Sequence, residues 1–125
     1  MKIESVELRR IHLDLVAPFE TSFGVQTKRD VLLMKVATDA GEGWGECVAG
    51  EEPVYSSEYV DGAQDVLMRH LIPRLRDRDL AAVDVATLLH PVHGHQMAKA
   101  AIEMAVLDAE LRAKDESFEI GRAHV

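Results

Sequence analysis

The feature that most constrains the fold of this chain is a nearly continuous apolar stretch at residues 31–38, followed by a turn and a glycine-rich segment. Such a stretch predicts a central strand that is covered on at least one face. Asp39-Ala40-Gly41 predicts a tight turn, and Gly43-Trp44-Gly45-Glu46-Cys47 then predicts a strand that returns antiparallel. These residues therefore predict a hairpin as the middle of the fold.

The first fifteen residues add a third strand to this hairpin. Apolar residues alternate along residues 2–15, and the phase of the alternation changes near Arg9-Arg10, which predicts a bulge or bend. Residues 17–29 carry Pro18, Gly24 and several polar residues, so we expect a long loop there. The first half of the chain thus predicts a three-stranded antiparallel meander.

The second half predicts helices. Ser56 and Ser57 are candidate N-caps for a helix that Pro73 interrupts or ends, and a shorter helix is expected over residues 81–89. The strongest helical pattern covers residues 96–113, which contain no glycine or proline and whose alanines allow close approach by a neighbour. The predicted fold class is α+β: a three-stranded antiparallel meander followed by a helical bundle.

Composition excludes several classes of protein. A chain of 125 residues with 47% apolar and 29% charged residues is one globular domain. The net charge of −8 argues against binding to nucleic acid. No apolar run is long enough to cross a membrane, no signal peptide is visible, and the single cysteine, Cys47, fits a reducing cytoplasm. We therefore expect a cytoplasmic protein with no membrane partner.

Five motifs in order resemble one known family. They are Phe19-Glu20-Thr21-Ser22-Phe23-Gly24, the Gly43–Cys47 segment, Tyr55-Ser56-Ser57-Glu58-Tyr59, residues 94–101 and residues 103–113. Together they resemble the N-terminal capping domain of the enolase superfamily, with the greatest similarity to the o-succinylbenzoate synthase and N-acylamino acid racemase group. The dipeptide epimerases and the muconate-type cycloisomerases fit residues 94–101 less well. The resemblance extends from residue 3 to about residue 118.

This resemblance implies an active site made of two parts. In the family, a (β/α)₈ barrel supplies two lysines and three acidic ligands of a divalent metal, usually magnesium. One lysine removes the proton α to the carboxylate of a small-molecule substrate, and the metal stabilises the enediolate. A barrel needs about 250 residues, and the lysines of this chain contain no Lys-x-Lys pair of the catalytic kind. We therefore expect no catalytic residue, metal ligand or cofactor in this chain, and no activity by itself.

The same resemblance sets the expected domain organisation. Residues 1–118 correspond to the capping domain, and the catalytic barrel is the missing partner. Residues 119–125 depart from the family pattern, so we expect a truncated or non-native tail there. A homo-oligomer is compatible with the resemblance, which does not fix the oligomeric state. The alternative function is a stand-alone, non-catalytic binding or interaction module with a capping-domain fold.

The resemblance also implies which residues contact substrate. Phe19, Thr21 and Phe23 would face the variable side chain of the substrate, and Gly50 would form a second wall and enlarge the pocket. Aromatic residues exclude water and offer apolar contact, which suits this role. The alternative is that Phe19 and Phe23 only anchor a loop on the core.

Four residues of the glycine-rich strand have two interpretations each. Gly43 and Gly45 allow close approach of a ligand or of the barrel, although a bulge or strand crossing is the favoured interpretation. Glu46 is interpreted as a carboxylate bonded to nearby backbone rather than as a catalytic acid. Cys47 is interpreted as a small buried residue rather than as a nucleophile, because no partner base is identifiable.

Two further sites attract attention. His90, His93 and His95 could bind a metal, but their spacing offers no helical i, i+4 pair, so metal binding is not the favoured interpretation, and His95 could instead cap the last helix. Asp108 lies in an apolar stretch of that helix. We expect its carboxylate to be satisfied by a basic neighbour or a backbone N–H.

Overall fold

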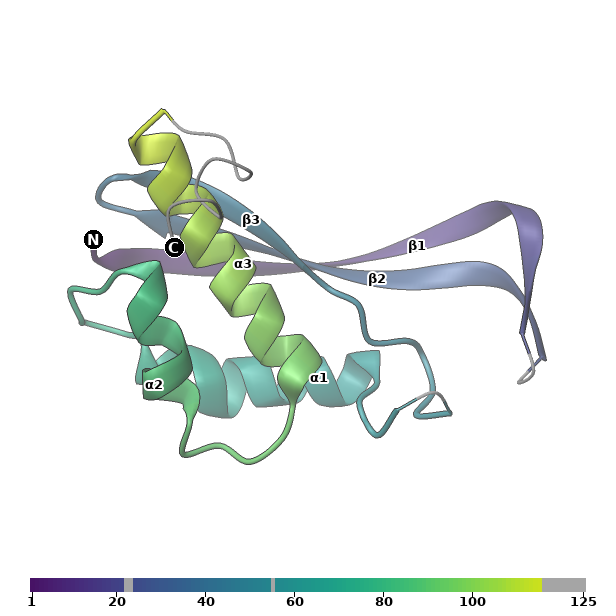
Figure 1. Ribbon diagram of the computed structural model, residues 1–125. Helices are drawn as coiled ribbons and strands as arrows, with labels where there is room; N and C mark the ends of the chain where they lie inside the picture. Colours follow the sequence, from purple (N-terminus) through teal and green to yellow (C-terminus); the bar gives the residue numbers. More distant parts are fainter. Residues whose placement is uncertain (22–23, 55, 116–125) are drawn as a thin grey trace.

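The computed structural model describes residues 1–21, 24–54 and 56–115, and for residues 13–21 and 24–29 only the path of the backbone. Strands β1 (Ile3–Thr21), β2 (Gly24–Thr38) and β3 (Gly41–Cys47) form an antiparallel sheet in the order β1-β2-β3. Helices follow the sheet in the sequence and pack on one of its faces (Figure 1). The predicted meander, with its central strand at β2, is confirmed. The predicted tail at residues 119–125 lies outside the described residues.

The two long strands form a ribbon where the sequence predicts a loop. Backbone pairing continues through Phe19 with Gln26 and Thr21 with Gly24, so the expected long loop over residues 17–29 is wrong. The register shifts between Asp14 and Phe19, and Pro18, which cannot donate to a ladder, lies within that irregularity. Figure 1 shows the ribbon extending away from the body formed by the sheet and the helices.

The predicted bulge near Arg9-Arg10 is also wrong. Pairing of β1 with β2 is regular from Ser5 to Asp14. The apolar phase changes because Arg10 occupies the row that faces the helices, opposite Leu32, while Ile11 lies on the other face opposite Val31. A polar residue in an inward row thus imitates a change of phase without any change of register.

Within the residues that the structure describes, the helical half has six segments. They are α1 (Val60–Val66), the π-helical turn η1 (Leu67–Leu71), the 3₁₀ turn η2 (Ile72–Arg74), the 3₁₀ turn η3 (Ala82–Asp84), α2 (Val85–Leu89) and α3 (Gln96–Ala113). The predictions over residues 81–89 and 96–113 are confirmed. No described helix combines the length and the apolar character that a membrane span requires.

The first helical run begins and ends for local reasons. Its N-cap is Tyr59, so the prediction that Ser56 or Ser57 caps it is wrong. The hydroxyl of Ser56 instead accepts a hydrogen bond from the N–H of Glu58 at 3.2 Å. Pro73 lies in η2, where the helix tightens and stops, because proline has no N–H to continue the α-helical ladder. The predicted interruption at Pro73 is therefore confirmed.

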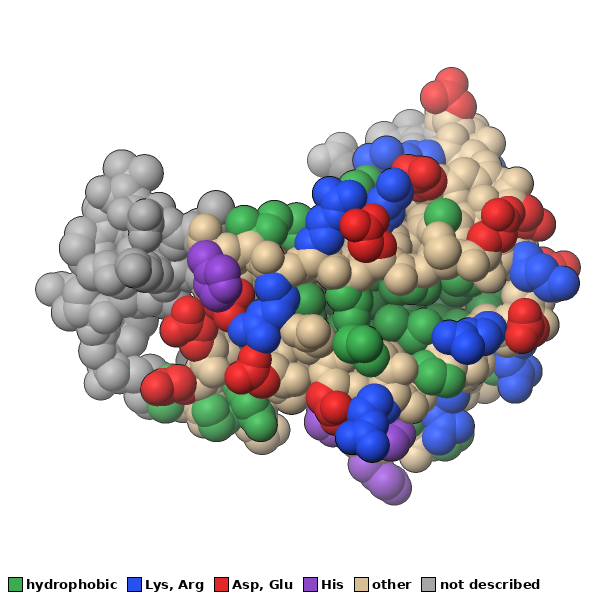
Figure 2. All heavy atoms as spheres, turned by 180° about the vertical axis from the view of Figure 1, so that it is seen from behind, with side chains coloured by type: hydrophobic (Ala, Val, Ile, Leu, Met, Phe, Trp, Pro, Cys, Tyr) green, Lys and Arg blue, Asp and Glu red, His purple; other side chains and the backbone are tan. Residues whose placement is uncertain are grey.

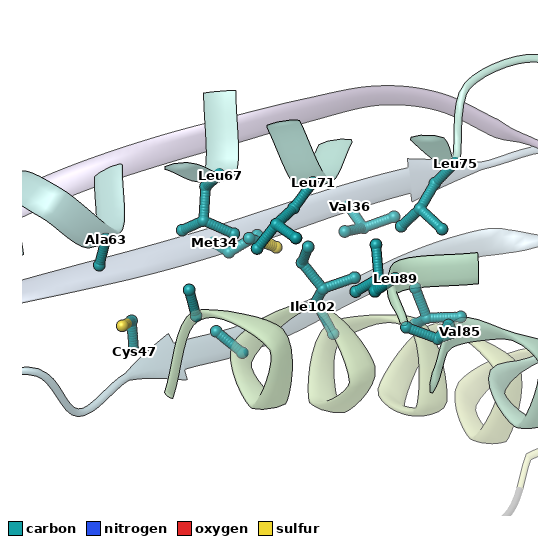
Figure 3. Packing of buried hydrophobic residues seen from close by; sticks show 14 of the residues in the cluster. Met34, Val36, Cys47, Ala63, Leu67, Leu71, Leu75, Val85, Leu89 and Ile102 are labelled. Carbon is teal, nitrogen blue, oxygen red and sulfur yellow. The ribbon is translucent and has the colours of Figure 1, made fainter. Parts of the chain in front are cut away.

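The core lies between the sheet and the helices. Figure 3 shows Met34 and Val36 of β2 pointing towards Leu67 and Leu71 of the first helical run and Ile102 of α3. All five side chains are buried. On β1 and β2, the apolar residues that face this core alternate with period two, as expected for a sheet covered on one face.

Helix α3 packs directly on the backbone of β3. A Cβ at Gly43 would lie 2.1 Å from the carbonyl oxygen of Ala105, and a Cβ at Gly45 would lie 2.2 Å from that of Ala101. Both distances are shorter than real contacts allow, so only glycine permits this approach. These glycines do allow a close approach, and the partner is α3 rather than a ligand or the barrel. The contact with α3 explains both glycines without the bulge or strand crossing that was the favoured interpretation.

Candidate functional site

The predicted substrate-contacting residues lie on two separate segments. Phe19 and Thr21 are on the β1 side of the ribbon, where the structure describes their backbone, and Phe23 lies outside the described residues. Gly50 follows β3 in residues 48–59, which connect the sheet to α1. The ribbon and this connecting segment leave the body at the same end of the molecule (Figure 1).

The connecting segment is held on the body near Gly50. The carbonyl oxygen of Gly50 accepts a hydrogen bond of 2.8 Å from the N–H of Val60, and Gly50 forms a parallel bridge with Tyr59. Val48 and Val54 in the same segment are 58% and 55% exposed. A Cβ at Gly50 would meet nothing closer than the carbonyl oxygen of Glu52 at 3.9 Å. Gly50 is therefore an open position beside exposed apolar side chains.

Glu58 fixes the far end of the connecting segment. Its carboxylate accepts hydrogen bonds from the N–H groups of Met97, at 2.9 Å, and Ala98, at 3.2 Å, in the first turn of α3. His95 is the N-cap residue by position, with φ of 56°, but its side chain makes no capping bond. The suggestion that His95 caps the helix is thus wrong, and the capping carboxylate comes from Glu58, which lies 39 positions before Met97.

A charged cluster lies where the ribbon joins the body. The guanidinium of Arg10 on β1 binds one carboxylate oxygen of Asp30 on β2 and the carboxylate of Asp61 on α1. The Nδ1 atom of His12 lies 3.6 Å from the other oxygen of Asp30, Oδ1. Glu51 of the connecting segment completes the group, because a carboxylate oxygen of Glu51 lies within 4.8 Å of a ring nitrogen of His12 and of a carboxylate oxygen of Asp30. The cluster therefore links β1, β2, α1 and the connecting segment.

Asp30 is the buried member of this charged cluster. Its side chain is only 3% exposed. The carboxylate oxygen Oδ1 of Asp30 has no hydrogen-bond partner among the described residues. Asp30 continues the inward row of Leu32, Met34 and Val36 along β2. The signal that could have identified it is its place in this period-two row, where a charged side chain requires a partner.

Two other predictions about single residues are confirmed. Cys47 is buried, and burial raises the pKa of its thiol, as expected of a small core residue. The carboxylate of Asp108 accepts a hydrogen bond of 2.9 Å from the N–H of Trp44 and pairs with Arg112 at 3.1 Å. Asp108 therefore joins α3 to β3 and has no evident chemical role.

The remaining candidates lie apart from these contacts. His90, His93 and His95 are exposed, and in the described parts of the chain they do not belong to any group of three donors close enough to share an ion. Glu46 is half-buried on the face of β3 that points away from α3. The expected bond of Glu46 to nearby backbone stays a prediction.

The magnesium implied by the family resemblance does not fit these residues. Magnesium takes oxygen ligands in near-octahedral geometry. Among the described residues, the one group of three side chains that could share a metal ion is His12, Asp30 and Glu51. It includes an imidazole, and Arg10 already binds one oxygen of the buried Asp30 carboxylate. We therefore place no step of magnesium chemistry on this chain.

A comparison with known proteins identifies the family. The model of the mandelate racemase / muconate lactonizing enzyme N-terminal domain matches residues 5–119. An N-succinylamino acid racemase from Amycolatopsis is 58% identical over 94% of this chain and 32% of its own length. An o-succinylbenzoate synthase from Enterococcus faecalis is 34% identical over 94% of this chain and 33% of its own length.

Solved structures agree with this result. A member of the enolase superfamily from Listeria innocua matches 91% of this chain and 31% of its own, with 31% identity and a TM-score of 0.87. An N-succinyl Arg/Lys racemase from Bacillus cereus matches 90% of this chain and 31% of its own, with 29% identity and a TM-score of 0.82. The chain thus spans about a third of the length of its relatives. It belongs to the mandelate racemase / muconate lactonizing enzyme family of the enolase superfamily and has the fold of the N-terminal domain of that family.

Proposed function

We propose that this chain is the substrate-capping part of a divalent-metal-dependent enzyme that abstracts the α-proton of a carboxylate substrate. The proposed activities are those of the N-succinylamino acid racemases and o-succinylbenzoate synthases to which it is similar. The observation that carries the proposal is the 58% identity to about a third of a racemase, across nearly the whole of this chain. The alternative of a stand-alone binding module has no comparable observation in its favour.

In this proposal the chain supplies contacts and the rest of the enzyme supplies chemistry. The proton-transferring lysines and the metal ligands belong to the barrel that the resemblance implies. When bound there, the magnesium or other divalent ion stabilises the negative charge that develops on the substrate carboxylate. The capping part excludes water and selects the substrate side chain, so it contributes to specificity.

Two segments of the chain suit this role. Phe19 and Thr21 belong to the ribbon that would cover the substrate, and Phe23 follows them in the sequence. Gly50 is an open position in a segment that hydrogen bonds fix on the body, beside the exposed Val48 and Val54. A fixed segment with exposed apolar side chains can contact a substrate or the second part of an enzyme without prior rearrangement.

The proposal is tested by restoring the missing part. Residues 1–113 are joined to the remaining two thirds of the Amycolatopsis racemase, and α-proton exchange of an N-succinylamino acid is followed by NMR in deuterated water with magnesium present. We expect exchange by the joined protein, and at least about a hundredfold less exchange by this chain alone or by the racemase part alone. The part that orients the substrate is then separated from the part that carries the catalytic groups. Exchange by this chain alone, or a folded joined protein without exchange, would contradict the proposal.

A further inference from the structure

The cluster at the base of the ribbon contains an arrangement of donors that the family resemblance does not account for. His12, Asp30 and Glu51 each present one ligand atom, and these atoms lie within 4.8 Å of one another. They come from β1, β2 and the connecting segment, so the fold and not a short sequence motif brings them together. Figure 2 shows a histidine, acidic side chains and basic side chains gathered where the described surface meets the ribbon.

The buried oxygen of Asp30 is the strongest indication of a ligand. A carboxylate oxygen removed from water without a hydrogen bond is costly, and native structures rarely leave one unsatisfied. Arg10 binds the other oxygen of Asp30 and so holds the carboxylate with Oδ1 on the side of His12. This arrangement resembles a metal ligand that a neighbouring side chain keeps in position.

The spacing of the donors fits a tetrahedral ion. Zinc binds imidazole nitrogen and carboxylate oxygen at about 2.0–2.2 Å, so two ligand atoms in a tetrahedral site lie roughly 3.4 Å apart. The Nδ1 atom of His12 and Oδ1 of Asp30 are 3.6 Å apart. Glu51 is exposed, so its side chain can move the remaining distance without disturbing the core.

The local charge also suits a cation. Arg10 pairs with the carboxylates of Asp30 and Asp61, and Glu51 adds a third carboxylate close to Asp30, so the surroundings carry an excess of negative charge before His12 is counted. The imidazole of His12 is 75% exposed, which leaves the site open to water for a fourth ligand.

We propose that His12, Asp30 and Glu51 form a binding site for a zinc-like divalent transition-metal ion, with water as the remaining ligand. By binding all three side chains, the ion cross-links the base of the ribbon to the connecting segment that carries Gly50. One imidazole and two carboxylates favour zinc over magnesium, which requires more oxygen ligands. The proposal rests on these residues alone and does not depend on the proposed function.

The test uses the 125-residue chain. Zinc chloride is titrated into metal-free protein by calorimetry, and thermal unfolding is followed with and without zinc. We expect one zinc per chain, a higher melting temperature with zinc, and binding weakened at least about tenfold by His12→Ala and by Glu51→Gln. Both residues are exposed, so circular dichroism of the metal-free variants should match that of the parent chain.

His93→Ala and Glu52→Gln are the matched controls, because they remove an exposed histidine and an exposed carboxylate outside the donor group. Both controls should bind zinc as the parent chain does, and magnesium at the same concentration should bind at least about tenfold more weakly. The proposal is overturned if zinc does not bind, if His12→Ala and Glu51→Gln bind normally, if His93→Ala abolishes binding, or if magnesium binds as tightly.

Discussion

At the scale of single residues, the contact between β3 and α3 depends on two missing Cβ atoms. Gly45→Ala would place a methyl group 2.2 Å from the carbonyl oxygen of Ala101, so either the helix must move or the strand must distort. We expect a loss of about 3 kcal/mol in the free energy of unfolding, or failure to fold, because backbone cannot yield as a side chain can. Urea denaturation followed by circular dichroism measures the change.

Gly50→Ala is the control for this substitution. Its new Cβ would lie 3.9 Å from the nearest atom, an ordinary contact, so we expect a change of less than about 0.5 kcal/mol. Equal losses in the two variants would contradict the account of the β3–α3 contact.

The capping of α3 by Glu58 is a second property of one side chain. Glu58→Ala removes the acceptor of the N–H groups of Met97 and Ala98, and we expect a loss of about 1–2 kcal/mol in unfolding free energy. Glu103→Ala, an exposed change farther along α3, should alter stability by less than about 0.5 kcal/mol. A Glu58→Ala variant as stable as its parent in urea would show that the cap is not formed in solution.

The thiol of Cys47 gives a chemical measure of the core. Burial raises the pKa of Cys47, so the thiolate that reacts with disulfide reagents is scarce in the folded chain at neutral pH. We expect Ellman's reagent to react slowly with the native chain and rapidly in denaturant. Rapid reaction in both conditions would mean that the space between β3 and the helices opens readily.

At the scale of elements, the ion pairs of Arg10 join both strands of the ribbon base to α1. Arg10→Ala would leave the carboxylate of Asp30 buried without its counter-ion, and we expect a loss of about 2 kcal/mol, less than for a fully buried pair because Arg10 is partly exposed. Urea denaturation measures this loss.

Arg9→Ala is the comparison for this element, because Arg9 pairs with the exposed Glu7 and lies 5.4 Å from the ring of Trp44. We expect it to cost clearly less than Arg10→Ala, because water screens an exposed ion pair. If Arg9→Ala destabilised the chain as much as Arg10→Ala, the burial of Asp30 would not be the cause.

The same scale shows where sequence reasoning succeeded and failed. The β2 strand and α3 were predictable because each packs against another layer, which imposes a clear apolar period. The ribbon over residues 17–29 was not, since a two-stranded extension beyond the helices carries no such pattern and contains Pro18 and Gly24. Arg10 and Asp30 were missed because a partly buried ion pair interrupts the apolar alternation that identifies inward positions.

At the scale of the whole molecule, the chain matches only about a third of each relative, and the described residues form one core between a sheet and its helices. The family was recognisable from motifs in order, because these motifs include the glycines that let α3 reach β3. The three-donor cluster was not recognisable, since its members are separated by 18 and 21 positions and only the pairing of β1 with β2 and the path after β3 bring them together.

The central claim is that this chain selects the substrate while another part of the enzyme transforms it. The most direct test is the ratio of kcat/KM for N-succinylamino acids with a large and a small side chain, measured on the protein joined to the Amycolatopsis racemase part. Gly50→Leu should lower kcat/KM for the large substrate at least about tenfold and leave the small one nearly unchanged, because the added side chain would narrow the pocket wall that we propose Gly50 forms. An unchanged ratio, or an equal loss for both substrates in a folded protein, would contradict the claim.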